Sequence, residues 1–437
     1  MNALRYLTYR AIQTVLWSCS FLLPWRTPEL LQKAGALGSL ADHIRRQDVT
    51  STLIITDHTI VELGLLVPLL EGLEAEGISY SIFDDTVPDP TIDNVESALR
   101  MFYDDGCEAI IGFGGGSPLD CAKGVAARVS RPKKSIRRLA GFLKVRRRTV
   151  HLYAVPTTAG TGSETTVAAV ITDPETRRKH AVNDVCLIPD TAVLDPRLLT
   201  GLPPEITAYS GMDALCHAVE AYIGRSNTKE TRQRSLEAVH LIFANLRASY
   251  EDGSSLEARS KMQLASFKAG QAFTRAYVGN VHAVAHTLGG FYHVPHGLAN
   301  AVILPVMLEY YSSAVHDALA ELADAVPLMP GGATAPTQAG AIAPARGGVT
   351  LPTHGDGTPP RPEVSPAEKA RAFITAIREL NEAMNIPDGF DCIRDEDIPT
   401  MISHALSEAN PVYPVPVILD REDMEEIYRR IQRPAGR

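Results

Sequence analysis

Two short stretches of the chain place metal-binding side chains one helical turn apart. His282 and His286 are four positions apart, and His296 follows them between a proline and a glycine. Asp213 and His217, also four apart, lie in an apolar run with helical periodicity. Residues four apart share one face of an α-helix. Any one of these histidines could be a hydrogen-bonded core residue, but together they predict a centre for Zn²⁺ or Fe²⁺ with a position open for substrate.

A glycine-rich turn follows an apolar segment that we expect to be a strand, residues 109–112. Consecutive glycines let a backbone approach a pyrophosphate closely, and the N-terminus of a following helix offers it free N–H groups. A second turn, residues 156–164, is rich in threonine, serine and glycine and also follows an expected strand. The glycine spacing departs from the GxGxxG fingerprint, and either turn alone fits an ordinary capped helix.

The amino-acid sequences of the two metal-binding stretches are more specific than the spacing of their ligands. GMDALCHAVEAYI and VHAVAHTLGGFYHVPHG resemble the metal-site signatures of the iron-containing (group III) alcohol dehydrogenases, which have the dehydroquinate synthase-like fold. The resemblance covers roughly residues 28–325 and resumes near residue 366. It implies that His286, which is not a ligand, lies near the substrate and the nicotinamide, and that the ligands are Asp213, His217, His282 and His296.

The same resemblance assigns the glycine-rich turn, because GGGSPLD with Ala122-Lys123 behind it is the family's dinucleotide loop. Asp57 ends the first expected strand, where a carboxylate accepts hydrogen bonds from a ribose and repels a 2′-phosphate, so NAD is favoured over NADP. Asp89 departs from the asparagine that the family often has near the cofactor. The expected cofactor-binding residues are Asp57, Gly114, Gly115, Gly116, Ser117, Asp120, Thr157, Thr158, Thr161 and Lys179.

The elements that must position these residues alternate between strand and helix up to about residue 203. Helices are expected at 60–76 and 95–103, and strands at 52–56, 80–83, 109–112, 151–155, 168–172 and 191–194. This alternation predicts an α/β dinucleotide-binding domain, residues 28–203, with a parallel, Rossmann-like sheet covered by helices. Beyond Pro203-Pro204 the pattern is helical, with helices expected at 308–322, 366–384 and 420–428. We therefore expect an all-α metal-binding domain at 204–437.

Two segments fall outside this pattern. The first 27 residues carry Arg5, Arg10 and Arg26 but no acid, and their apolar part is too short to span a bilayer. They fit a targeting segment, a membrane-surface helix, or an extra helix that packs on the body or on a partner subunit. Residues 327–365 are rich in Pro, Gly, Ala and Thr, which predicts a surface insertion or a disordered loop.

Net charge and cysteine content narrow the possible partners and location of the protein. The net charge of −9 argues against nucleic acid as the main partner. Nine Lys or Arg residues between 131 and 148 read as a solvated cationic edge, because among aromatic residues only Phe142 interleaves with them. The six cysteines are scattered without a CxxC pair, which favours reduced thiols and a cytoplasmic location. We expect Cys216, next to a proposed ligand, to be a packing residue.

The sequence thus predicts an NAD-dependent, Fe²⁺-dependent alcohol dehydrogenase that interconverts an alcohol with an aldehyde or ketone. Zn²⁺ is the alternative ion. We expect a small-molecule substrate, no nucleic acid, and a homo-oligomer of two or more subunits. The alternatives are a zinc-type glycerol dehydrogenase, a dehydroquinate synthase-like enzyme, or a non-catalytic scaffold. The identity of the alcohol does not follow from the sequence.

Overall fold

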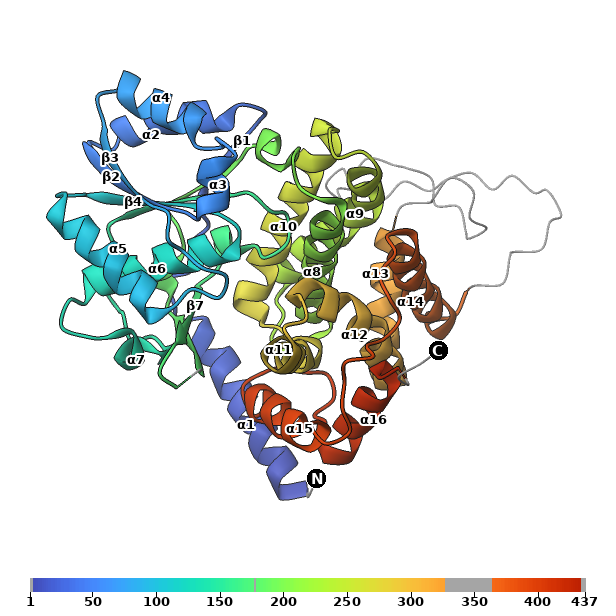
Figure 1. Cartoon of the computed structure of the whole chain (residues 1–437). Coiled ribbons are helices and arrows are strands. Elements are labelled where there is room, and N and C mark those ends of the chain that lie inside the picture. The colour runs from blue at the N-terminus through green and yellow to red at the C-terminus, as the bar shows by residue number, and fades with distance from the viewer. Residues whose placement is uncertain (1–2, 177, 327–363, 434–437) are drawn as a thin grey trace, which may run out of the picture.

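The structure is a computed structural model, which describes residues 3–176, 178–326 and 364–433 (Figure 1). An α/β part, drawn in blue to green, lies beside a helical part, drawn in green to red. The predicted insertion at 327–365 lies outside the described residues except for its last two positions.

The α/β part is built on one six-stranded sheet in which every neighbouring pair of strands is parallel. The strand order is β1-β9-β6-β4-β2-β3. Successive residues point to opposite faces, so Leu53 packs with one set of helices and Ile54 with the other. The strands are β1 Glu29–Gln32, β2 Ser51–Ile55, β3 Ser79–Phe83, β4 Ala109–Gly114, β6 His151–Pro156 and β9 Thr191–Leu194. The predicted parallel sheet is confirmed.

Helices cover both faces of this sheet. Helices α2 (Leu40–Arg45) and α4 (Val67–Ala75) pack on one face, and α5 (Ile92–Asp104) and α6 (Gly116–Ser130) on the other. The single helix predicted at 60–76 is wrong, because α3 (His58–Glu62) ends before α4 begins. Gly64 lies between them with a φ of 67°, a left-handed conformation that interrupts the helix.

One predicted strand belongs to a different sheet. β7 (Ala168–Asp173) pairs antiparallel with β8 (Arg178–Asn183), and β5 (Gly141–Phe142) completes this three-stranded sheet. The expectation that 168–172 joins the parallel sheet is therefore wrong. Buried and half-buried residues alternate along β7, which is the pattern of a sheet with only one covered face.

From residue 204 onward the described residues form helices and loops without an extended strand, as predicted. Helix α8 is the centre of this part, and every residue from Gly211 to Ile223 is buried. A Cβ on Gly211 would lie 2.2 Å from Leu246 Cδ1, so a larger residue there would force the Leu246 side chain to move. The helices are α8 Pro204–Ile223, α9 Lys229–Glu251, α10 Leu256–Ala276, α11 Asn280–Tyr292, α12 His296–Tyr311, α13 His316–Ala325, α14 Pro366–Ala383, α15 Ile398–Ala409 and α16 Arg421–Ile431.

The turn after β6 joins the two parts by close backbone contact. A Cβ on Gly160 would lie 2.6 Å from the carbonyl oxygen of Ser210, which is on α8. A Cβ on Gly162 would lie 2.7 Å from the Cα of Gly270, which is on α10. Gly162 also has a φ of 59°. These glycines let the turn lie directly against α8, which carries Asp213 and His217, and against α10.

The N-terminal segment forms helix α1 (Ala3–Ser20), which runs along the lower edge of the molecule in Figure 1. The Arg10 guanidinium donates to the carbonyl oxygens of Val415 and Pro416, at 2.7 and 2.8 Å. The Gln13 amide donates to the carbonyl oxygen of Tyr413 at 2.7 Å. Of the three interpretations, the structure thus contains an extra helix packed on the body. None of the helices in the described ranges is long and apolar enough to span a bilayer.

Candidate metal centre and cofactor site

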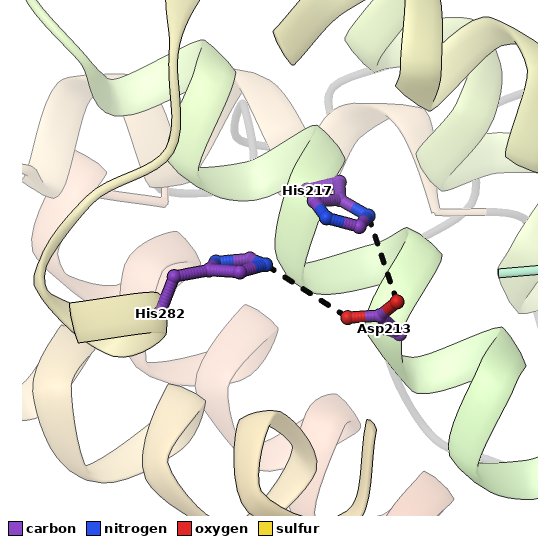
Figure 2. A group of neighbouring side chains, drawn as sticks. All are labelled: Asp213, His217 and His282. Carbon is purple, nitrogen blue, oxygen red and sulfur yellow. Dashed lines mark ion pairs between the residues drawn. The ribbon is translucent and has the colours of Figure 1, made fainter. Parts of the chain in front are cut away.

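Three of the predicted ligands converge in the buried interior of the helical part (Figure 2). Asp213 and His217 project from α8 and His282 from α11, and each offers an atom within 4.8 Å of the others. His217 Nδ1 lies 3.9 Å from one Asp213 oxygen, and His282 Nε2 lies 3.8 Å from the other. His296, the first residue of α12, brings its Nε2 to 3.4 Å from Asp213 Oδ1. Ligands about 2.1 Å from a tetrahedral ion are themselves about 3.4 Å apart, so these separations suit a shared ion.

The side chain of Asn300 tests whether these residues fit a cation. Its amide nitrogen lies 2.7 Å from Asp213 Oδ1, 3.2 Å from His282 Nε2 and 3.1 Å from His296 Nε2. A single N–H₂ group therefore faces three acceptors, while Asn300 Oδ1 and His217 Nδ1, both buried, have no hydrogen-bond partner among the described residues. A divalent ion would satisfy the same acceptors, so the residues present fit one.

The imidazoles are in the protonation state that a metal ion needs. Burial lowers the pKa of His217, lowers that of His282 well below its ordinary value, and lowers that of His296 to about 4. Neutral rings keep a lone pair for coordination. The rings also pack on one another, with 4.6 Å between the centroids of His217 and His282, and Phe273 stacks on His217 at 4.0 Å.

A buried carboxylate that the sequence did not single out fixes the orientation of His282. Glu220 Oε2 accepts from His282 Nδ1 at 2.6 Å and from the Gly279 amide at 2.8 Å, and Oε1 accepts from the Val281 amide at 2.8 Å. The proton is thereby held on Nδ1, which leaves Nε2 free to face Asp213. Burial raises the pKa of Glu220 to about 7. Its position three residues after His217 was the available signal.

His286 stands next to these residues but faces a different partner. Its Nδ1 lies 2.6 Å from Glu408 Oε1, and the Tyr413 hydroxyl donates to the same oxygen at 2.8 Å. Its ring stacks on His296 with 5.0 Å between centroids. Burial lowers the pKa of His286, but the Glu408 carboxylate outweighs it and the pKa is raised overall. Glu408 and Tyr413 follow His286 by more than 120 residues, so no local sequence pattern could predict their contact with it.

Cys216 is a packing residue, as expected. Its side chain is fully buried, and its Sγ lies 3.7 Å from His282 Nδ1. Burial raises the pKa of the thiol well above its ordinary value, so it remains protonated.

The predicted cofactor residues meet at the C-terminal edge of the parallel sheet. β2 and β4 are neighbours while β3 lies beyond β2, so the strand order reverses between β2 and β4. Ligands of open α/β sheets bind at such a reversal. Asp57 follows β2, and Gly114 ends β4. Gly115 caps helix α6 without a side-chain hydrogen bond, which leaves backbone N–H groups of the first turn available to an anion.

The two predicted turns touch each other at this edge. Gly114 has a φ of 144°, and a Cβ there would lie 2.6 Å from Pro118, so glycine is required. The Thr157 amide donates to the Gly114 carbonyl at 2.9 Å. A Cβ on Gly116 would lie 3.1 Å from Thr161. Thr158 Oγ1 is buried without a hydrogen-bond partner within the described part, so it is available to form a hydrogen bond with a polar ligand.

Lys179 connects this edge with the histidines. Its ammonium lies 2.7 Å from Asp89 Oδ1, and the Asp89 amide donates to Ser117 Oγ at 3.2 Å. Its charge also contributes to lowering the pKa of His296. Lys179 is therefore linked to the glycine-rich turn through Asp89, its ion-pair partner.

The two predicted cofactor aspartates differ in what they contact. Asp57 Oδ1 accepts from the Ile60 amide at 3.1 Å and caps α3, while Oδ2 takes part in no hydrogen bond within the described ranges. Asp120 uses both oxygens inside the protein, accepting from Ser163 Oγ at 2.9 Å and from the Val170 amide at 3.0 Å. Asp120 therefore ties α6 to the second turn and to β7.

Comparison with known proteins accounts for both halves of this site. Residues 27–196 match the family model described as iron-containing alcohol dehydrogenase, and residues 207–345 match the model of that family's C-terminal part. The chain belongs to the iron-containing alcohol dehydrogenase family.

Individual members of the iron-containing alcohol dehydrogenases are similar over most of this chain. Lactaldehyde reductase of Escherichia coli K12 is 32% identical over 377 residues, 86% of this chain and 90% of that protein. Alcohol dehydrogenase 4 of Saccharomyces cerevisiae YJM789 is 40% identical over 275 residues, 63% of this chain and 72% of that protein. The solved structure of an alcohol dehydrogenase from Oenococcus oeni covers 94% of this chain and 100% of its own, with 30% identity and a TM-score of 0.82.

Membership in the iron-containing alcohol dehydrogenases confirms the predicted family, fold and class of reaction. The chain is an oxidoreductase that acts on a CH–OH group. The non-catalytic scaffold, the least favoured of the alternatives, has no support from the site, since all four predicted ligand positions carry side chains able to bind a metal ion.

Proposed function

We propose that the protein interconverts a small alcohol and its aldehyde or ketone with NAD, using Fe²⁺ held by Asp213, His217, His282 and His296. The single observation that carries this proposal is the convergence of Asp213, His282 and His296 around one N–H₂ group, with His217 and His286 alongside. The same ligand set would accept Zn²⁺. Relatives named lactaldehyde reductase and alcohol dehydrogenase support a short substrate.

When bound, the metal ion supplies a Lewis acid for the substrate oxygen, and the nicotinamide carries the hydride. His286 holds or releases the substrate proton at Nε2, because its Nδ1 proton is engaged by Glu408. Its raised pKa suits a group that must take a proton and return it. Glu408 and Tyr413 keep the ring oriented, and Glu220 does the same for His282.

The C-terminal edge of the sheet would hold the cofactor. Backbone N–H groups at the start of α6 bind the pyrophosphate, and Asp57 Oδ2 accepts from a ribose hydroxyl and disfavours NADP. Lys179 neutralises charge between the cofactor and the metal centre. The contributing residues are Gly114, Gly115, Gly116, Ser117, Thr157, Thr158 and Thr161, with Asp120 holding the two turns together.

The two binding functions belong to different parts of the chain. We assign NAD binding to a domain of residues 28–203 and metal binding to a domain of residues 204–437. Strand β9 ends at Leu194 and α8 begins at Pro204, which supports a boundary near Pro203. We further propose a homo-oligomer in the cytoplasm, where the six unpaired cysteines would remain reduced.

The test is NADH formation from a panel of short alcohols and diols by protein purified without oxygen. Activity should vanish after chelation and return with Fe²⁺ or Zn²⁺, which identifies the working ion. Asp213→Asn should lose bound metal and activity together. The matched change Asp317→Asn, at an exposed position on α13, should keep both. If the protein holds one metal ion per chain and no alcohol gives NADH, the proposal is wrong and a lyase of the same fold becomes the better candidate.

A further inference from the structure

Helix α1 is attached to the body through polar side chains. Arg10 and Gln13 bond to backbone carbonyls of residues 413–416, and Gln13 and Ser20 are the buried residues of the helix. These positions follow the three-to-four-residue spacing of one helical face. The face that α1 turns toward the protein is therefore held by polar side chains, with the half-buried Trp17 between Gln13 and Ser20.

The remaining surface of α1 is apolar and exposed to solvent. Leu7 is 63% exposed and Val15 60% exposed, although both are large aliphatic residues. A helix on the surface of a globular protein normally turns such residues inward and its polar residues outward. Contiguous exposed apolar surface of this kind marks an interaction site. The exposed apolar residues of the helix include Leu4, Leu7, Ile12, Val15 and Leu16, and Leu22 follows its end.

The charged side chains of α1 and of the segment that follows it are all positive. The first acid of the chain is Glu29, whereas Arg5, Arg10 and Arg26 precede it, although the chain as a whole carries a net charge of −9. Arg225 acts electrostatically on Tyr6 of α1, so it adds a further cation beside the helix.

The cationic edge at 131–148 adjoins the end of this segment. Arg26 donates to the carbonyl oxygen of Ile188 and pairs with Asp190, and Asp184, nearby in the chain, accepts from the amides of Val145 and Arg146. Phe142, within the same edge, is 52% exposed. Exposed apolar side chains are thus found both on α1 and on the cationic edge beside it.

We propose that α1 docks on an anionic phospholipid bilayer and lies in the plane of its headgroups. Its leucine and valine side chains would enter the boundary of the acyl chains, and the exposed Lys and Arg side chains of the adjoining edge at 131–148 would face the lipid phosphates. Charge favours this occupant over a second copy of the chain, because α1 has no acid to pair with the arginines of another α1. Trp17 and Trp25, the two tryptophans of the chain, lie in this segment and are half-buried, with the Trp25 indole donating to the carbonyl oxygen of Ser20.

The two tryptophans provide a reporter confined to the segment. The full-length, metal-loaded protein is mixed with vesicles of phosphatidylcholine, with or without phosphatidylglycerol. We expect co-sedimentation with the phosphatidylglycerol vesicles, weaker binding as salt is raised, and a blue shift of tryptophan emission. The absence of vesicle binding, or equal binding to uncharged vesicles at all salt concentrations, would overturn the proposal.

A pair of variants distinguishes vesicle binding through α1 from non-specific binding through other exposed apolar residues. The double change Leu7→Ser and Val15→Ser should lower the vesicle partition coefficient about tenfold or more. The control is Leu63→Ser with Val67→Ser, which removes apolar residues of 65% and 49% exposure elsewhere on the surface and should leave binding unchanged. If the α1 variant instead dissociates an oligomer, as seen by sedimentation velocity without lipid, a second copy covers α1 and the proposal fails.

Discussion

Replacement of Glu220 by glutamine tests how much the metal centre depends on the carboxylate behind it. Glu220 accepts three hydrogen bonds, from His282 Nδ1 and from the amides of Gly279 and Val281, and its side chain is buried. Glutamine has one oxygen in place of two. If that oxygen takes the position of Oε2 it keeps two of the three bonds, and its N–H₂ group then faces the Val281 amide, donor against donor.

The size of the effect follows from this count. A buried donor left without a partner costs about 1–3 kcal/mol of stability. The loss of the charge also makes His282 a weaker ligand, and changes of this kind lower metal affinity by about 10–100-fold. That range corresponds to roughly 1.4–2.7 kcal/mol of binding free energy. We therefore expect Glu220→Gln to fold, to unfold more readily, and to lose its metal to a chelator that the wild type resists.

The assay is competition for Fe²⁺ or Zn²⁺ with a chelator of known affinity, followed by urea denaturation of the metal-free protein. Glu205→Gln is the matched control, because Glu205 is an exposed glutamate on the first turn of the same helix. A Glu220→Gln protein that binds metal as tightly as Glu205→Gln would refute the role given to Glu220. It would then be a packing residue with no influence on the ligand.

Three further changes address the cofactor, the proton and the fold. Asp57→Asn keeps an oxygen to cap α3 but removes the charge, so the ratio of kcat/KM for NADP to that for NAD should rise; an unchanged ratio would exclude Asp57 from cofactor selection. Glu408→Gln should lower kcat about tenfold with metal content unchanged, since His286 loses the charge that orients and activates it; a normal kcat would remove Glu408 from the mechanism. Arg137 holds the pKa of Asp173 below its ordinary value, so this pair stabilises the fold above about pH 4 and the benefit disappears as the pH falls further. In urea denaturation, Arg137→Gln should be destabilised at neutral pH and approach the wild type in acid; an equal difference at both would contradict this.

The order of secondary structure was predictable where periodicity and length agreed. The inner strands of the parallel sheet are continuous apolar runs, and their neighbours are helices, so both were expected correctly except at 60–76, where Gly64 separates α3 from α4. β8 begins with Arg178 and Lys179, and β5 has two residues, so neither shows the apolar alternation of a strand. β1 is a four-residue edge strand with no fully buried residue. These three strands exist because partners elsewhere in the chain offer them hydrogen bonds, which local sequence does not record.

The site divides in the same way. Ligands spaced four residues apart were visible in the sequence, because helix geometry alone brings Asp213 and His217 to one face. The residues that orient the imidazoles were not visible. Glu408 reaches His286 across the interface of α11 and α15, and Asn300 reaches Asp213 from α12. Such contacts depend on how helices pack, and one sequence without packing information does not specify them.

The contact of Gly162 with Gly270 restricts how this enzyme can be recombined with its relatives. A Cβ on either glycine would lie within 3 Å of the backbone of the other, and Gly160 meets Ser210 equally closely. A chimera that joins the sheet of one dehydrogenase to the helices of another must therefore preserve small residues on both sides of the junction. Larger residues at this junction would push the sheet and the helices apart, and with them the glycine-rich turn and the metal-binding residues. We expect the two halves to be exchangeable only between parents that share these glycines.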